Sequence, residues 1–306
     1  MEKCARIYVA GNRTLIGGAM LRVLGGQGYT QVLREPEPDL TNDAEVDAFF
    51  ERSRPEYVIV AAGKSGGIAL NRRAPATLMT HNMLVAVHLM RAAHRHGAKK
   101  LVYVGSSCIY PRLSAQPTPV EALGTGPLEP TSEAYALAKL AGLGLVSAYR
   151  REHGAPFIGM IPSNVFGPDD DFAAEDSHVV GALMRRMHDA KRTGAPALTV
   201  WGSGTPRREL IYSEDLADAC LFLLERYDGD APVNVGSGSE VSIAELARLV
   251  ADVVGYSGEL LFDPTKPDGA PHKSLDSTPL FSLGWCAKTG LRDALATTYA
   301  AAVGAW

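Results

Sequence analysis

Residues 5–17 read Ala5-Arg6-Ile7-Tyr8-Val9-Ala10-Gly11-Asn12-Arg13-Thr14-Leu15-Ile16-Gly17. The first six residues form an apolar run typical of a buried strand, and a helix-like pattern extends from Gly17 to Leu24. Between them, Gly11–Gly17 has small residues where a dinucleotide pyrophosphate rests on a helix N-terminus. Thr14 stands where the middle glycine of such a loop usually lies, so an ordinary strand–helix turn is the competing interpretation. Residues farther along the chain are needed to distinguish the two interpretations.

The first half of the chain continues this alternation of strand and helix. Apolar strand candidates are followed by helical patterns over Thr77–His96 and Ser132–Arg151. The strand candidates are Gln31–Leu33, Tyr57–Ala62, Leu101–Gly105 and Phe157–Ile161. Such βαβ alternation predicts an α/β fold of the Rossmann type, with a doubly wound parallel sheet and a ligand at the carboxyl ends of the strands.

The pattern changes after Pro168. Asp169–Asp176 is acidic and lacks periodicity, which predicts a loop, and Lys266-Pro267-Asp268-Gly269 predicts a turn. Asp230–Gly236 resembles one more strand of the sheet. We therefore predict an NADP-binding Rossmann domain over 1–167, with a returning segment near 210–240, and a smaller interleaved α/β substrate domain over 168–306.

Composition excludes several classes of protein. The 306 residues are 46% hydrophobic and 21% charged, with a formal charge of -4, so disorder and recruitment of nucleic acid or an anionic membrane are not expected. No apolar run approaches the ~18 residues of a membrane span. The N-terminus lacks the apolar core of a signal peptide, which predicts a cytoplasmic enzyme. The cysteines have no paired spacing, so neither disulfides nor a metal site is predicted: Cys4, Cys108, Cys220 and Cys286.

Three residue types point to acid–base chemistry. Ser106 follows the strand at 101–105, and Tyr135 and Lys139 stand four positions apart in a helical pattern, on one face. A nearby lysine ammonium is expected to lower the pKa of the phenol toward the working range, and the serine would hold a carbonyl oxygen near it. The alternative for Tyr-x-x-x-Lys alone is an amphipathic helix with a surface lysine.

The nicotinamide type depends on residues near the end of the second strand. Arg13 and Arg34 would suit a 2′-phosphate and favour NADP(H), whereas Glu35 would repel it and leaves NAD(H) open.

Taken together, these motifs resemble those of the extended short-chain dehydrogenase/reductases over nearly the whole chain. Within them the chain is similar to the group that epimerises and reduces GDP-4-keto-6-deoxy sugars. The motifs that carry the resemblance are Ala10-Gly11-x-Arg13, Lys64-x-Gly66-Gly67-Ile68, Gly105-Ser106-Ser107-Cys108-Ile109-Tyr110-Pro111, Tyr135-x-x-x-Lys139, Asn164-x-x-Gly167-Pro168, Ser177-His178-Val179, Trp201-Gly202-Ser203-Gly204-Thr205-Pro206-x-Arg208-Glu209 and Lys266-Pro267-Asp268-Gly269.

The resemblance implies two reactions at one site. Ser106, Tyr135 and Lys139 would reduce C4, and Cys108 and His178 would be the acid–base pair that inverts C3 and C5. The C4 ketone acidifies the protons on both carbons, and a thiol near pKa ~8.5 acts as base only where the site lowers its pKa. Without their surroundings, a lone cysteine is usually an inert buried residue and a lone loop histidine is usually solvated.

The resemblance also implies ligand-binding residues. NADP(H) would be held by Gly11, Asn12, Arg13, Thr14, Leu15, Ile16, Gly17, Arg34, Ala62, Lys139, Pro162, Asn164, Val165 and His178. The GDP-sugar would be held by Arg186, Trp201, Arg208 and Asp276. For Arg186, beside Arg185, the competing interpretation is a solvated helix face.

The chain departs from this family in places. Asn12 and Thr14 replace a histidine and a glycine, and Pro36 occupies the place of an arginine expected at the 2′-phosphate. The expected product is GDP-L-fucose. The same chemistry on a dideoxyhexose or deoxyheptose stays open, as does a nucleotide-sugar 4-epimerase or 4-reductase without 3,5-epimerisation. A homodimer is expected, and a set of apolar residues would serve either its interface or the core: Leu137, Leu140, Leu143 and Val146.

Overall fold

The computed structural model of the chain describes residues 1–34, 36–172, 177–266, 268–304 and 306. Glu35, residues 173–176 of the expected acidic loop and Pro267 of the expected turn lie outside the described residues. The described residues 169–172 form no helix or strand, in agreement with the predicted loop.

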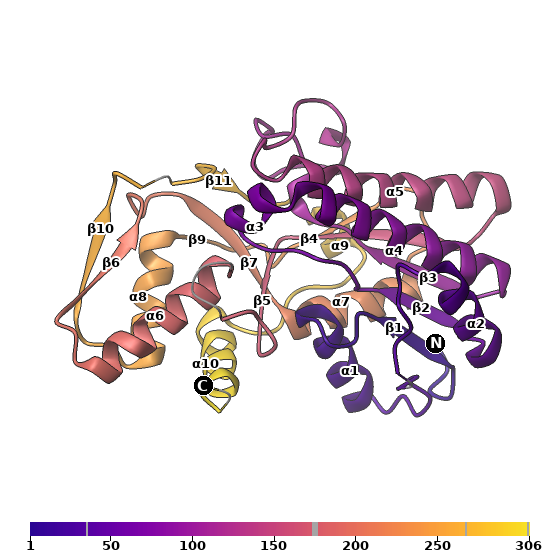
Figure 1. Cartoon of the computed structure of the whole chain (residues 1–306), viewed down its shortest axis with the longest axis horizontal. Helices are drawn as coiled ribbons and strands as arrows, with labels where there is room; N and C mark the ends of the chain where they lie inside the picture. The colour runs from indigo at the N-terminus through magenta and orange to yellow at the C-terminus, as the bar shows by residue number, and fades with distance from the viewer. Residues whose placement is uncertain (35, 173–176, 267, 305) are drawn as a thin grey trace.

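A five-stranded sheet forms the larger part of the molecule, and all its strands are parallel (Figure 1). Its order is β1 (Ile7–Ala10), β2 (Tyr57–Val60), β3 (Lys100–Val104), β4 (Phe157–Pro162) and β8 (Val233–Val235). Nearly every residue of these strands is buried, which explains why they are continuous apolar runs rather than alternating ones. The predicted α/β class is confirmed.

One expected strand is reduced to a single bridge. Within Gln31–Leu33 only Val32 pairs with the sheet, opposite Ile7. Leu33 N–H donates to the Ile7 carbonyl at 2.8 Å, and the chain then leaves the sheet. Pro36 and Pro38 follow and lack the N–H group that a longer ladder would need.

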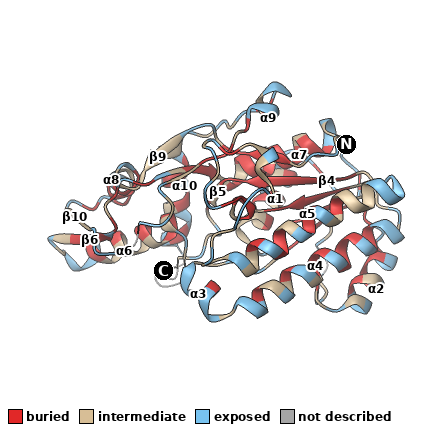
Figure 2. Cartoon of the chain, turned by 90° about the horizontal axis from the view of Figure 1, so that it is seen from above, coloured by how far each residue is buried: buried red, intermediate tan, exposed pale blue. Residues whose placement is uncertain are grey.

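Helices cover both faces of this sheet (Figure 1). On one face α1 (Leu15–Gly26) packs against α7 (Ser213–Arg226), and on the other α4 (Pro75–Arg95) packs against α5 (Glu133–His153). The outer helix α2 (Asp43–Ser53) lies against α4, and α3 (Ile68–Arg73) precedes α4. Figure 2 shows buried residues along the inward sides of α4 and α5.

The smaller part is built on two short sheets. The strands are β5 (Asn164–Phe166), β7 (Arg207–Tyr212), β9 (Glu240–Ser242) and β11 (His272–Lys273) in one, and β6 (Ala197–Trp201) and β10 (Glu259–Asp263) in the other. Its helices are α6 (Val179–Thr193), α8 (Ile243–Val254) and α10 (Leu291–Val303), whereas α9 (Thr278–Ser282) packs against β8 of the large sheet. A separate apolar core joins α6, α8 and α10 to β6 and β7.

Connections between the two parts bring the site together. The chain passes directly from β4 to β5, then returns through α7 to β8, which pairs with β4. The carboxyl ends of β1 to β4 therefore face elements contributed by the smaller part. No helix in the described portion of the chain is both long and apolar enough to cross a bilayer.

Candidate active site

The turn between β1 and α1 is a tight cradle. Gly11 has a φ of +80°, and a Cβ there would lie 2.6 Å from the Cα of Ala62. Thr14 is the N-cap of α1, and its hydroxyl accepts from the N–H of Gly17 at 3.1 Å. The first turn of a helix has further N–H groups without intrahelical acceptors, here at Leu15 and Ile16. The close backbone approach and this helix N-terminus fit a dinucleotide pyrophosphate.

Replacing Gly17 by alanine tests this cradle. The added Cβ would lie 1.9 Å from the carbonyl oxygen of Gly11, so the turn has to open. We expect Gly17→Ala to weaken NADPH binding by about tenfold or more, measured by fluorescence titration, because the backbone donors are displaced.

The matched control lies in the same helix. Gly25 has no atom within 4 Å of its would-be Cβ. Gly25→Ala should leave NADPH affinity unchanged and raise stability by roughly 0.5–1 kcal/mol through helix propensity. Equal NADPH affinity in the two variants would contradict the assignment of the cradle.

A residue that the sequence analysis missed lies at the Gly11 end of the cradle. The Glu37 carboxylate accepts from the N–H of Gly11 at 2.6 Å and from the Tyr8 hydroxyl at 3.2 Å. Burial raises the pKa of Glu37, against these hydrogen bonds and the charge of Arg13. Arg13 and Arg34 are both exposed at this end. No sequence motif includes Glu37, because its contact with Gly11 forms only where the chain turns back after Val32.

The remaining predicted cofactor residues lie at the carboxyl ends of neighbouring strands. Ala62 follows β2 and is buried, Pro162 ends β4, and Asn164 and Val165 begin β5. Between the last two strands, the Ser163 hydroxyl is buried and has no hydrogen-bond partner within the described residues. An unpaired buried hydroxyl at this edge fits a site that receives a polar ligand.

Ser106, Tyr135 and Lys139 meet beside the end of β3. Tyr135 and Lys139 lie one turn apart on α5, and Ser106 is near enough to Tyr135 to lower the pKa of its phenol. The Lys139 ammonium donates to the Val104 carbonyl at 3.0 Å and is 6% exposed. The predicted triad is thus assembled in space.

The electrostatics of this triad differ from the expectation. Burial, together with the charge of Cys108, raises the pKa of Tyr135, and Lys139 is not among the groups that lower it. Burial also lowers the pKa of Lys139 to about 8. The expected lowering of the phenol pKa by Lys139 is therefore not met, because removal from water favours the neutral form of both groups.

Cys108 lies on the same loop as Ser106. It belongs to the short 3-10 helix Ser107–Ile109, and its N–H donates to the Ser106 hydroxyl at 3.3 Å. Burial would raise the pKa of the thiol, but the charge of Lys273 and hydrogen bonds from Ser106 and Lys273 outweigh it, and the pKa is lowered. Lys273 Nζ lies 3.4 Å from Sγ. No motif marked Lys273, since 165 residues separate it from Cys108.

His178 is the second member of the predicted acid–base pair. It precedes α6 as its N-cap residue and is exposed. Desolvation by surrounding protein, with the charge of Lys273, lowers the pKa of the imidazole, and Asp171 opposes this effect. At neutral pH the ring is then mostly neutral, and water can restore its proton after each transfer.

Asp170 is a second residue that the sequence analysis did not single out. Its Oδ2 is buried with no partner among the described residues, and its Oδ1 accepts from the N–H of Asp171 at 2.9 Å. Burial raises the pKa to about 7. Below about pH 4 both the native and unfolded chains hold this proton, whereas between pH 4 and 7 only the native chain does.

Stability should therefore fall as pH rises through this window, by up to roughly 1.4 kcal/mol per pH unit from this group. In Asp170→Asn the amide cannot ionise. We expect the free energy of unfolding of Asp170→Asn to decline less steeply than that of the wild type between pH 4.5 and 7, in urea titrations. Parallel pH profiles of the two proteins would show that Asp170 is ionised in the native state.

The predicted substrate residues lie on the smaller part. Arg185 pairs with Asp189 on the helix surface, as expected of a solvated face, whereas Arg186 donates to the Thr199 carbonyl of β6. Trp201, at the end of β6, is 65% exposed, as a stacking platform would be. Lys266 lies over its ring at 5.8 Å.

Arg208 and Asp276 both lie near Lys273, one across the strand pair and one along the chain. Arg208 is opposite Lys273 in the β7–β11 pair, and Asp276 lies three residues farther along the chain. Asp268, in the predicted turn, accepts from Ser203 N–H at 2.6 Å and, through its carbonyl, from Arg208 at 3.5 Å. The turn thus links the segment after Trp201 to Arg208.

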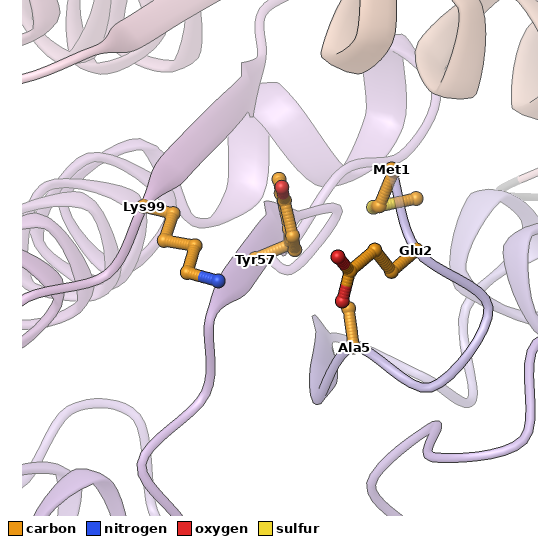
Figure 3. A pocket seen from close by; sticks show the side chains of 5 residues that line it. All are labelled: Met1, Glu2, Ala5, Tyr57 and Lys99. Carbon is orange, nitrogen blue, oxygen red and sulfur yellow. The ribbon is translucent and has the colours of Figure 1, made fainter.

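A surface pocket elsewhere does not contribute. It is lined by Met1, Glu2, Ala5, Tyr57 and Lys99, at the amino ends of the parallel strands (Figure 3). Ala62, Ser106 and Pro162 lie at the carboxyl ends, on the other edge of the sheet.

Comparison with known proteins agrees with this geometry. Residues 7–236 match the NAD dependent epimerase/dehydratase family. The chain belongs to this family. It is 51% identical to GDP-L-fucose synthase 1 of Arabidopsis thaliana, over 97% of this chain and 93% of the relative. It is 42% identical to the GDP-L-fucose synthase of Escherichia coli strain K12, over 96% and 95%.

A solved structure gives the same result. The GDP-mannoheptose C4 reductase of Campylobacter jejuni, with NADP bound, matches with a TM-score of 0.90 at 29% identity, covering 99% of each chain. The chain is therefore an enzyme of a nicotinamide-dependent family, and the relatives named here act on sugar nucleotides.

Proposed function

We propose that the chain carries out 3,5-epimerisation and NADPH-dependent 4-keto reduction of a GDP-4-keto-6-deoxy sugar and so forms GDP-L-fucose. One observation carries the proposal. The N–H of Cys108 donates to the Ser106 hydroxyl, and Ser106 and Cys108 both act on the pKa of the Tyr135 phenol, so the thiol for epimerisation and the phenol for reduction lie beside one oxygen-binding hydroxyl.

NADP(H) fits the cradle formed by Gly11, Thr14 and the N-terminus of α1, with the exposed Arg13 and Arg34 beside the place of a 2′-phosphate. When bound, it supplies the hydride for C4. Tyr135 gives a proton to the C4 oxygen, and Ser106 holds that oxygen by a hydrogen bond. Lys139, whose ammonium donates to the Val104 carbonyl, would hold the ribose of the cofactor.

Epimerisation precedes reduction because it needs the C4 ketone. The Cys108 thiolate removes a proton from the carbon next to the ketone, and the electron pair moves onto the C4 oxygen, where Ser106 and Tyr135 stabilise it. His178 returns a proton to the opposite face. The same pair acts at C3 and at C5, since the ketone acidifies both. Exposed His178 then exchanges protons with water.

The nucleotide end lies over the smaller part. Arg186 and Arg208 pair with the diphosphate through their forked donors, and Trp201 offers an exposed ring to the base or the sugar. Asp276 accepts from a hydroxyl or the base, and its carboxylate is already aligned by the N–H of Thr278 at 3.0 Å.

The test is a reaction in deuterated water. The protein is incubated with GDP-4-keto-6-deoxymannose and NADPH, and deuterium is located in the product by NMR. We expect label at both C3 and C5 with NADPH consumed. A reduced, unlabelled product would make the enzyme a simple 4-reductase. No consumption with NADPH or NADH would redirect the search to a keto-heptose or dideoxyhexose.

We also propose the organisation around this function. The division into an NADP-binding domain over 1–167, returning near 210–240, and a substrate domain over 168–306 fits the path of the chain through α7 and β8. Leu143 and Val146 belong to the core, whereas Leu137 is 40% exposed. Met83 and Val87 on the neighbouring α4 are also exposed, and exposed apolar residues on two packed helices suit a homodimer interface. Light scattering on the purified protein measures its mass in solution, and we expect the mass of a homodimer. A cytoplasmic location stays a prediction.

A further inference from the structure

The epimerisation proposed above requires a thiolate, and the structure contains a cation at the thiol. Lys273 Nζ lies 3.4 Å from Sγ of Cys108 and donates to it. We propose that Lys273 is a positioning residue that holds Cys108 in the thiolate form and so makes it the base for C3 and C5. This inference rests on the proposed function for its role in catalysis, but the ion pair itself is independent of the substrate.

The backbone around Lys273 is held from two sides. In β11 it pairs with Arg208 of β7, and Ser274 N–H donates to the Gln116 side chain at 2.7 Å. The next residue, Leu275, donates its N–H to the Glu209 carboxylate at 2.8 Å. Gln116 lies on the segment that follows Cys108 along the chain. The same short strand therefore fixes Lys273 relative to the loop that carries the thiol.

Glu209 strengthens this arrangement. It is 1% exposed, and its carboxylate also accepts from the N–H of Gly238 at 2.8 Å. On the other side, the Thr118 N–H donates to the Ser274 carbonyl at 3.0 Å, and the Thr118 carbonyl accepts from the Asp276 N–H at 2.9 Å. A long lysine side chain loses much rotational freedom when it is confined, and these anchors place its stem so that the ammonium reaches Sγ.

Four groups share the electrostatic surroundings of the thiol. Lys273 of β11 and Ser106 of its own loop lower the pKa of Cys108, and the charge of Cys108 in turn acts on Tyr135 of α5. The charges of Lys273 and Asp171 act on the fourth group, His178 at the start of α6. Tyr135 is neutral and the lowered pKa of His178 makes it mostly neutral at pH 7. Lys273 is thus the only positive charge that these contacts bring to Sγ from the described residues.

The proton balance follows from this pairing. Cys108 begins as thiolate and ends as thiol, having taken the carbon-bound proton, while the electron pair goes to the C4 oxygen. Lys273 keeps all its protons and its charge throughout. The protonated form of His178, which water replenishes, gives one proton to the opposite face of the carbon and becomes the neutral imidazole. After the step Cys108 releases its proton to water, and the Lys273 charge favours that release.

An alternative use of Lys273 is to bind a substrate phosphate, since Arg208 is its neighbour in the strand pair. The two uses predict different results. A phosphate contact would change the KM for the GDP-sugar and leave the free enzyme's thiol unaffected, whereas the proposed pairing would change the thiol in the absence of any substrate.

The first measurement is alkylation of Cys108 by iodoacetamide as a function of pH, followed peptide by peptide by mass spectrometry in the full chain without substrate. The exposed Cys4 and Cys286 are internal references. We expect Lys273→Met to raise the midpoint for Cys108 by about one pH unit or more, a tenfold loss of thiolate, and Lys273→Arg to restore most of it. His272→Gln, the neighbouring position on β11 whose side chain pairs with Glu240, controls for disturbance of the strand.

The second measurement separates the reactions. Lys273→Met should slow deuterium uptake at C3 and C5 by about tenfold or more. The reverse oxidation of GDP-L-fucose at C4 by NADP+, which does not need Cys108, should keep its kcat and KM within about threefold of wild type. An unchanged alkylation midpoint overturns the proposal, with or without a raised KM. A shifted midpoint in an enzyme inactive on the keto sugar would support the ion pair and refute the proposed substrate.

Discussion

Tyr135→Phe should lower NADPH-dependent reduction by about 10²–10⁴-fold, the usual contribution of one general acid. In the proposed mechanism this hydroxyl protonates the C4 oxygen, and Ser106 at the end of β3 acts on its pKa. Deuterium exchange at C3 and C5 should fall by less than about tenfold, because Ser106 still stabilises the C4 oxygen when a carbon proton is removed. The measurements are NADPH absorbance and NMR on the same reaction.

The control lies on the same helix. Tyr149 is also on α5, where its ring packs against His153 and Phe157 away from the site. Tyr149→Phe removes the same hydroxyl and should leave both reactions unchanged. Reduction by Tyr135→Phe within tenfold of wild type would mean that another group protonates C4.

Cys108→Ala should affect epimerisation strongly and the chemistry at C4 little, the reverse of Tyr135→Phe. Without the thiol, deuterium uptake at C3 and C5 should fall by about 10²–10⁴-fold, since no base remains on that face of the sugar. The reverse oxidation of GDP-L-fucose by NADP+ should survive, because Ser106, Tyr135 and Lys139 are untouched. NADPH consumption with the keto substrate should fall to the extent that reduction requires the epimerised sugar.

Cys286→Ser is the matched control, since this thiol is exposed and lies outside the site. It should match wild type in both assays. The buried Cys220 is unsuitable as a control, because its loss would leave a cavity in the core under α7. Retained uptake of deuterium in Cys108→Ala would reassign the base to His178 or to another residue.

Much of the fold could be predicted because it depends on local pattern. The strands at 57–60, 101–104 and 157–161 are continuous apolar runs, and the helices at 75–95 and 133–153 differ from the predicted limits by two residues or fewer. Gln31–Leu33 was wrong as a full strand, since an apolar triplet does not reveal that Pro36 and Pro38 end its pairing.

The sequence predicts which residues form the candidate site better than it predicts the pKa values of their side chains. Tyr135 and Lys139 share a face by helical spacing alone, but burial decides that the pKa of one rises and that of the other falls. The ordinary pKa of a side chain is that of the group in water, and the sequence carries no measure of how far each group is removed from water.

The strand–turn–helix at the N-terminus, the alternation of strands and helices, and the shared helix face of Tyr135 and Lys139 could be predicted from the sequence alone, because each depends on residues close together in the chain. The contacts of Cys108 with Lys273 and of Gly11 with Glu37 became visible only in the folded chain. Those pairs depend on where β11 and the segment after Val32 pack, which is set by strand pairing and burial over long separations rather than by any local periodicity.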